Sequence, residues 1–106
     1  MTVDLNNVTV SHNEDAQLFE LHIDGLRALL TYRLFQDRIV LTHTEVPEPL
    51  EGHGLAARLA RSALDFARAN HLRVVSLCPY VSNFIRKHAE YQDLVSPEDL
   101  QKLLSH

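Results

Sequence analysis

A glycine-rich segment, Gly52-His53-Gly54, directly precedes a long run of helical periodicity that begins at Leu55. The unpaired N–H groups in the first turn of a helix, together with the helix dipole, favour an anion at that end. Small residues at positions 52, 54 and 56 let a phosphate group approach the backbone closely. The segment therefore predicts a phosphate-binding loop.

Three residues elsewhere are candidates for acid–base or covalent chemistry. Cys78 ends an apolar run just before Pro79, a residue favoured at the first position of a helix. A helix N-terminus raises the thiolate fraction of a cysteine, whereas the alternative interpretation is a small buried hydrophobe. His43 and Glu45 lie in a predicted strand and are candidate bases for an amine or a thiol. The alternative interpretation of His43 is a histidine that is hydrogen-bonded to a cross-strand partner, and that of Glu45 is a solvated strand carboxylate.

Two common phosphate-binding motifs fit the glycine segment poorly. A P-loop requires Lys and Ser/Thr after its last glycine, but Leu55-Ala56 follows Gly54. In a dinucleotide fingerprint, G-x-G-x-x-G, the small positions would be Gly52, Gly54 and Ala57. The strands before the segment, however, predict an antiparallel meander rather than a doubly wound unit, and the chain is short for a dinucleotide domain.

The seven histidines raise the question of a metal site. No two of them lie three or four positions apart and none forms a His-x-His pair, so no local ligand pair is present. With a single cysteine, a structural zinc site is disfavoured as well. We expect no metal.

The first half of the chain predicts strands at 8–11, 18–23, 26–35 and 38–46. Phe19, Leu21 and Ile23 alternate with more polar residues, as in a half-buried strand. Asp24-Gly25 is a strong hairpin signal. Strict alternation over 38–46 would place Ile39, Leu41, His43 and Glu45 on one face, and Val40, Thr42, Thr44 and Val46 on the other. The face expected for 26–35 comprises Leu26, Ala28, Leu30, Tyr32 and Leu34.

The second half predicts helices around one further strand. Leu55, Leu59 and Ala63 recur at helical spacing, and Asn70 is a suitable C-terminal cap. A strand follows at 73–77, then helices over 80–88 and from Ser96 to about 104. A strand–helix–strand crossover makes its two strands parallel neighbours. We therefore expect one α/β (α+β) domain over 1–106, with a mixed, mainly antiparallel sheet and flanking helices.

Composition narrows the functional classes. The chain has 106 residues, a formal charge of −4 and one cysteine. An internal disulfide is impossible, the acidity gives no reason to expect nucleic acid, and no apolar run approaches the ~20 residues of a membrane span. The N-terminal residues lack the basic and apolar regions of a secretory signal. We expect a cytoplasmic monomer or homodimer without a membrane partner.

The end of the predicted strand and the loop after it resemble a known pattern. Val46-Pro47 followed by Gly54 and Ala56 resembles the acyl-CoA loop, Q/R-x-x-G-x-G/A, of the GCN5-related N-acetyltransferase superfamily. Glu51 departs from this pattern, because Gln or Arg is usual there. Residues 43–47, 77–81 and 85–91 resemble, in order and spacing, the small single-domain YjdJ-like branch. The resemblance covers residues 26–95.

The resemblance implies acetyl-CoA or coenzyme A as a cosubstrate. Pantetheine would pair with the backbone near Val46, and the pyrophosphate would lie on the N–H groups of residues 51–56. Helix residues after Cys78 would contact the cofactor too, or they form only a solvated helical face. The expected cofactor residues are Val46, Glu51, Gly52, His53, Gly54, Leu55, Ala56, Asn83, Arg86 and Lys87.

The resemblance also implies N-acetyl transfer to an unidentified amine. The amine would attack the thioester directly, or the acetyl group would pass through Cys78 with His43 as base. In this branch the matching cysteine is regarded as catalytic. The position that holds a general-acid tyrosine in many members corresponds to Ile85 here, with Tyr80 and Tyr91 out of register.

Two further interpretations stay open. The chain could be a non-catalytic acyl-CoA-binding module or partner subunit, since it has no room for a separate substrate domain. It could also be an interaction protein without a CoA site, which would leave the glycine loop unexplained.

Overall fold

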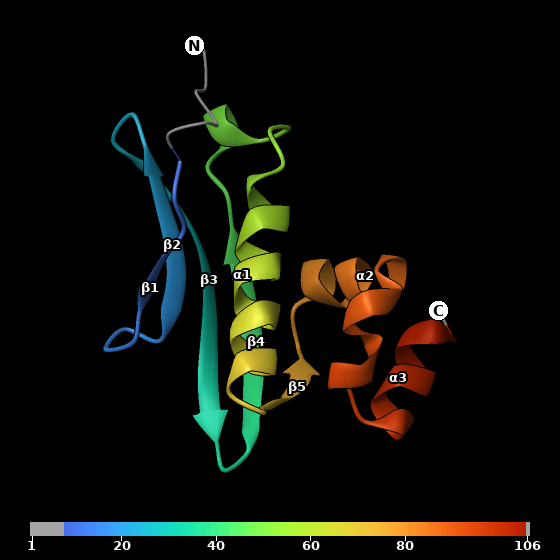
Figure 1. The fold of residues 1–106 in the computed structure, drawn as a ribbon. Coiled ribbons are helices and arrows are strands. Elements are labelled where there is room, and N and C mark those ends of the chain that lie inside the picture. The colour runs from blue at the N-terminus through green and yellow to red at the C-terminus, as the bar shows by residue number, and fades with distance from the viewer. Residues whose placement is uncertain (1–7, 106) are drawn as a thin grey trace.

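The computed structural model describes residues 8–105, which form a five-stranded sheet covered by helices (Figure 1). The strands follow the order β1-β2-β3-β4-β5, antiparallel except for the parallel β4–β5 pair. Their bounds are Ser11–Asn13, Leu18–Ile23, Leu26–Phe35, Arg38–Glu45 and Arg73–Ser76. The mixed, mainly antiparallel sheet is confirmed.

Helix α1 forms the crossover from β4 to β5, and the other two helices follow β5. Helix α1 spans Leu55–Ala69, α2 spans Pro79–Lys87 and α3 spans Pro97–Leu104, with short 3-10 turns η2 at Glu48–Leu50 and η3 at Ala89–Leu94. The Ser96 side chain caps α3 by accepting a hydrogen bond from the Asp99 N–H, at 3.2 Å. Among residues 8–105, no helix has the length and apolar character needed to cross a membrane.

Local signals explain the two main connections. Asp24 and Gly25 have φ angles of 52° and 79°, which suits a two-residue hairpin loop joining β2 to β3. Helix α1 buries Leu59, Ala63 and Leu64 against the sheet. Because alanines at the contact lack bulk, the helix can lie close to the strands. This positions the N-terminus of α1 beside the end of β4 (Figure 1).

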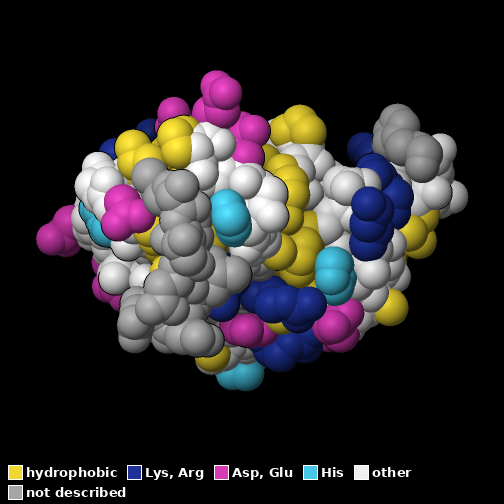
Figure 2. Space-filling model, turned by 90° about the horizontal axis from the view of Figure 1, so that it is seen from above, with side chains coloured by type: hydrophobic (Ala, Val, Ile, Leu, Met, Phe, Trp, Pro, Cys, Tyr) yellow, Lys and Arg dark blue, Asp and Glu magenta, His cyan; other side chains and the backbone are white. Residues whose placement is uncertain are grey.

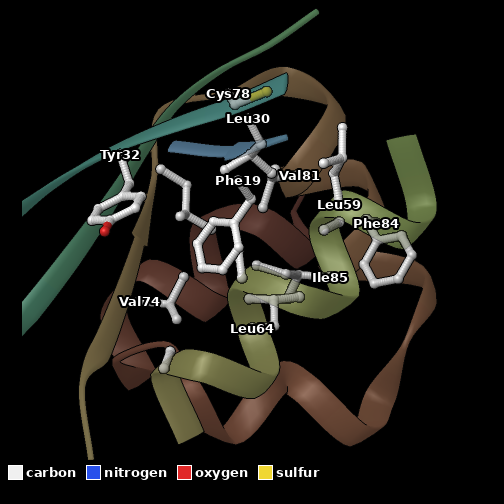
Figure 3. Close-up of a cluster of buried hydrophobic side chains, with 14 of the residues drawn as sticks. Phe19, Leu30, Tyr32, Leu59, Leu64, Val74, Cys78, Val81, Phe84 and Ile85 are labelled. Atoms are coloured by element: carbon white, nitrogen blue, oxygen red, sulfur yellow. The ribbon is translucent and has the colours of Figure 1, made fainter. Parts of the chain in front are cut away.

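A buried cluster joins the sheet to α1 and α2, and α3 packs against it through half-buried side chains. Phe19 and Leu30 from the sheet meet Leu64 of α1 and Ile85 of α2, and all are nearly inaccessible (Figure 3). We expect Leu64→Ala to destabilise the fold by about 2–5 kcal/mol, because a large buried side chain would leave a cavity. Chemical denaturation measures this change, and an effect below about 1 kcal/mol would contradict the packing.

The bounds predicted for the first strand were wrong. The first strand begins at Ser11 rather than at residue 8, because Ser11 to Asn13 pair with β2 and the His12 ring stacks on Phe19 at 4.2 Å. Leu34 lies on the predicted face, since it pairs with buried Ile39, yet it is 50% exposed. The reason is that the β3–β4 hairpin extends beyond the helices that cover the sheet (Figure 1).

The alternation predicted for β4 was also wrong, because the strand contains a β-bulge. The register passes from Tyr32↔Leu41 to Thr31↔His43, so Thr42 is an extra residue without a partner on β3. An extra residue re-aims the side chains that follow it. Ile39 and Leu41 face the core, but beyond the bulge Thr44 takes that face. His43 and Glu45 lie on the uncovered face of the sheet.

Candidate active site

The loop between β4 and α1 is built by two prolines and two left-handed glycines. Pro47 precedes η2, and Leu50 anchors this turn in the core with no exposed surface. Gly52 and Gly54 have φ angles of 83° and 74°, which other residues rarely adopt. A methyl group on either glycine would meet no atom within 4 Å, so the loop needs glycine for its backbone conformation and not for space.

The N-terminus of α1 is suited to an anion. Gly54 is the N-cap residue and has no side chain that could accept hydrogen bonds from the first-turn N–H groups. The first turn of α1 also contains no acidic residue. The positive end of the helix dipole is therefore not neutralised by the helix itself.

A groove of about 220 Å³ lies beside this loop and reaches from β4 to α2. Its lining residues are Val46, Leu50, Glu51, Gly52, Gly54, Leu55, Ala56 and Tyr80. Figure 2 looks down on this end of the molecule and shows a hydrophobic strip with Asp or Glu side chains at one end and Lys or Arg side chains at the other. An apolar groove beside an anion-binding helix end can hold a ligand that carries both an apolar chain and phosphates.

The structure places most of the expected cofactor residues at this groove, but not those on α2. The side chain of His53 is half-buried and does not line it. Arg86 donates through Nε to the Leu103 carbonyl at 2.7 Å and through Nη1 to Asn83 Oδ1 at 3.0 Å. Arg86 and Asn83 thus tie α2 to α3, and Lys87 is exposed away from the groove lining.

Tyr80 is a groove residue that the sequence did not single out. It lies in the first turn of α2 and is 38% exposed. Burial, with a smaller contribution from Cys78, raises the pKa of Tyr80 above the ordinary tyrosine value. The phenol therefore stays protonated at neutral pH and can donate a proton. Ile85, which aligns with the family's tyrosine, is fully buried in the core.

Cys78 lies where β4 and β5 separate. The parallel ladder ends at Leu41↔Ser76, and the Leu77 N–H donates to the Leu41 carbonyl at 2.9 Å. Cys78 follows as the N-cap residue of α2 and is 4% exposed. Its sulfur lies 3.2 Å from the Thr44 hydroxyl.

The structure does not bring His43 and Glu45 to this sulfur. Both are exposed, and in the ladder His43 pairs with Thr31 while Glu45 pairs with Leu29, on the face opposite to Thr44. The bulge at Thr42 is the cause. His43 as the base of Cys78 therefore finds no support in the geometry. Within residues 8–105, no three His, Cys, Asp or Glu side chains gather into a possible metal site.

A mixed sheet whose parallel strands separate beside a glycine loop at a helix N-terminus defines an acetyltransferase-type fold. The family model described as GCN5-related N-acetyl-transferase matches residues 18–94. The chain belongs to this family.

Curated relatives and a solved structure agree with this assignment. Protein NATD1 of Bos taurus is 35% identical over 95 residues, covering 85% of this chain and 84% of that protein. Protein NATD1 of Mus musculus is 33% identical over 95 residues, covering 85% and 86%. The NMR structure of a GCN5-like protein from Staphylococcus aureus is similar with a TM-score of 0.68 at 27% identity, covering 87% and 91% of the two chains.

Proposed function

We propose that the chain is an acetyl-CoA-dependent N-acetyltransferase that acts on an amine. The observation that carries this proposal is the groove that joins Val46, the glycine loop and Tyr80. It combines an apolar lining with an uncapped helix N-terminus, which matches pantetheine and pyrophosphate. Membership of the family supports the same reaction.

The lining residues divide the work of binding. The main chain near Val46 would pair with pantetheine like an added strand. The N–H groups after Gly52 and Gly54 would hold the pyrophosphate. Among the described residues that line the groove, Glu51 is the only charged one, and its carboxylate would oppose this anion.

That opposition gives a prediction for affinity. We expect Glu51→Gln to tighten CoA binding by about fivefold at low salt, because it removes roughly 1 kcal/mol of charge repulsion. The gain should shrink as added salt screens the charges. Glu48→Gln is the control, since exposed Glu48 lies outside the groove lining. Weaker binding by the Glu51 variant would show that the carboxylate helps to hold the ligand.

Acetyl-CoA brings the thioester, and the protein then has two routes. In direct transfer, a deprotonated amine attacks the acetyl carbon while a backbone N–H near Val46 stabilises the oxyanion. In the covalent route, Cys78 first takes the acetyl group. In the direct route, Tyr80 would give its proton to the departing CoA sulfur.

Isothermal titration with acetyl-CoA, and separately with CoA, tests the proposal, with Gly54→Glu as the binding-deficient variant. We expect both ligands to bind the wild-type chain and neither to bind the variant. Circular dichroism confirms that the variant folds. Absence of binding to the folded wild-type chain would reject the acetyltransferase assignment.

A second candidate is a non-catalytic acyl-CoA-binding module. Two observations favour it: His43 and Glu45 face away from Cys78, and Glu51 places a carboxylate among the groove-lining residues. The two functions differ in turnover. An enzyme releases CoA when an amine is added, whereas a binding module holds acetyl-CoA without consuming it.

A further inference from the structure

The Cys78 side chain is held by a contact from the neighbouring strand. Its Sγ lies 3.2 Å from Thr44 Oγ1, which is a hydrogen bond in which either atom can donate. Within residues 8–105, no other side chain is hydrogen-bonded to this sulfur. Figure 3 shows Cys78 at the margin of the buried cluster. Leu30, another member of this cluster, is the β3 partner of Thr44.

The backbone of Cys78 is fixed independently of the sulfur. Its carbonyl accepts hydrogen bonds from the Ser82 N–H at 3.0 Å and from the Ser76 hydroxyl at 3.1 Å. The hydroxyls of Ser76 and Ser82 lie 2.8 Å apart. With the main chain held in this way, the orientation of the thiol remains to be set by Thr44.

The bulge in β4 selects the residue that meets the sulfur. Without the extra residue Thr42, the alternation of β4 would turn His43 toward the core side of the sheet. With it, Thr44 takes that side. A neutral hydroxyl, which is too weakly basic to remove the thiol proton, therefore stands beside Cys78 in place of an imidazole.

We infer that Thr44 is the positioning residue for the Cys78 thiol. Its hydroxyl holds the sulfur in one orientation, and it donates a hydrogen bond to the sulfur when the sulfur carries negative charge. The use of this pair in acetyl transfer rests on the proposed function. The effect of Thr44 on the reactivity of the thiol does not depend on that function.

Such a donor would assist the covalent route. As Cys78 Sγ bonds to the acetyl carbon, the bond from that carbon to the CoA sulfur breaks, and the thiol proton ends on CoA. The amine then bonds to the same carbon, Cys78 Sγ leaves, and a proton from the amine returns to Cys78. No proton is gained or lost in the exchange of one thioester for another. A hydrogen bond to the sulfur stabilises the anionic form through which each step passes.

Alkylation of Cys78 by iodoacetamide, followed by mass spectrometry, tests the inference, because this is the only cysteine in the chain. We expect Thr44→Val to slow alkylation about tenfold at neutral pH, since a hydrogen bond to a charged group contributes on the order of 1.5 kcal/mol. The pH of half-maximal rate should move upward. Thr44→Ser, which keeps the hydroxyl, should restore both the rate and the pH profile.

Thr42→Val is the matched control. It removes a hydroxyl from the same strand, but that hydroxyl bonds Thr31 on the other face, at 2.7 Å. We expect this variant to alkylate like the wild type. Thermal unfolding shows whether each variant folds, and Thr44→Ala compared with Thr44→Ser replaces the valine variant if it does not.

Two results would overturn the inference. One is a Thr44→Val protein whose pH profile matches the wild type, since a change of access alone alters the rate equally at every pH. The other is a loss in Thr44→Ser as large as in Thr44→Val, which would indicate packing. Alkylation requires no acetyl-CoA. Failure of the wild-type chain to bind CoA would therefore reject the proposed function, while the alkylation rates of the Thr44 variants would still test the role of Thr44.

Discussion

Ala56→Glu should abolish CoA binding, with a loss of at least about 100-fold, while the fold remains intact. Ala56 lies in the first turn of α1 and lines the groove. A glutamate there occupies the groove and places a negative charge where the pyrophosphate would lie. An acidic residue in the first turn stabilises a helix by about 0.3–1 kcal/mol. The substitution should therefore weaken CoA binding without weakening the fold.

Ala69→Glu is the matched control for this prediction. It makes the same change at the exposed last residue of the same helix, at the end opposite the groove. Isothermal titration should show unchanged CoA affinity for this variant. CoA binding by Ala56→Glu at wild-type strength would place the ligand elsewhere on the molecule.

Tyr80→Phe should lower kcat by about 100-fold with KM nearly unchanged. The change removes one hydroxyl and keeps the ring, so it removes the proton donor and preserves the groove wall. General acid catalysis of this kind contributes about 10²–10⁴-fold to rate. Steady-state kinetics separates the two parameters. An unchanged kcat would exclude Tyr80 as the proton donor.

Tyr91→Phe serves as the control for Tyr80→Phe. The Tyr91 hydroxyl donates to Asp65 Oδ1 at 2.9 Å, away from the groove, so its loss should affect stability and not kcat. The direction of the Tyr80 pKa gives a second check. Because burial and Cys78 raise this pKa above the ordinary value of 10.0, the donor keeps its proton as the pH rises from neutral to that value. Activity should therefore not fall through Tyr80 in this range.

The fold and the loop were predictable because their signals are local. Asp24-Gly25 determines a hairpin, and Gly52 and Gly54 determine a left-handed loop before a helix. Each signal depends on the backbone preference of one or two residues. The amphipathic pattern of α1 then packs this helix on the sheet. The crossover therefore keeps the helix N-terminus and the loop beside the end of β4.

The side chain beside Cys78 was not predictable, because it depends on the register between two strands. Period two is uniform along a sequence, whereas the bulge at Thr42 exists only in the pairing of β3 with β4. A shift of one residue exchanges the faces. His43 was therefore expected where Thr44 lies.

The residues of α2 were misplaced for a related reason. Tyr80 was not expected to act as the general acid, because its position is out of register with the family's tyrosine. The direction in which α2 leaves β5 nevertheless brings the first turn of the helix to the groove. That direction depends on tertiary packing. Arg86 was expected at the cofactor, but α3 presents the Leu103 carbonyl, which accepts its hydrogen bond. The one signal for Tyr80 was its position directly after Cys78-Pro79.

The most direct measurement is the release of CoA from acetyl-CoA in the presence of a panel of amines. The panel includes polyamines, lysine peptides and aromatic amines, and chromatography detects CoA without a thiol reagent that would also modify Cys78. We expect CoA release that depends on an amine, yields its acetylated product, and is lost in Ala56→Glu. Tight binding of acetyl-CoA with no release above the buffer rate for any amine would contradict the enzyme and leave a binding module.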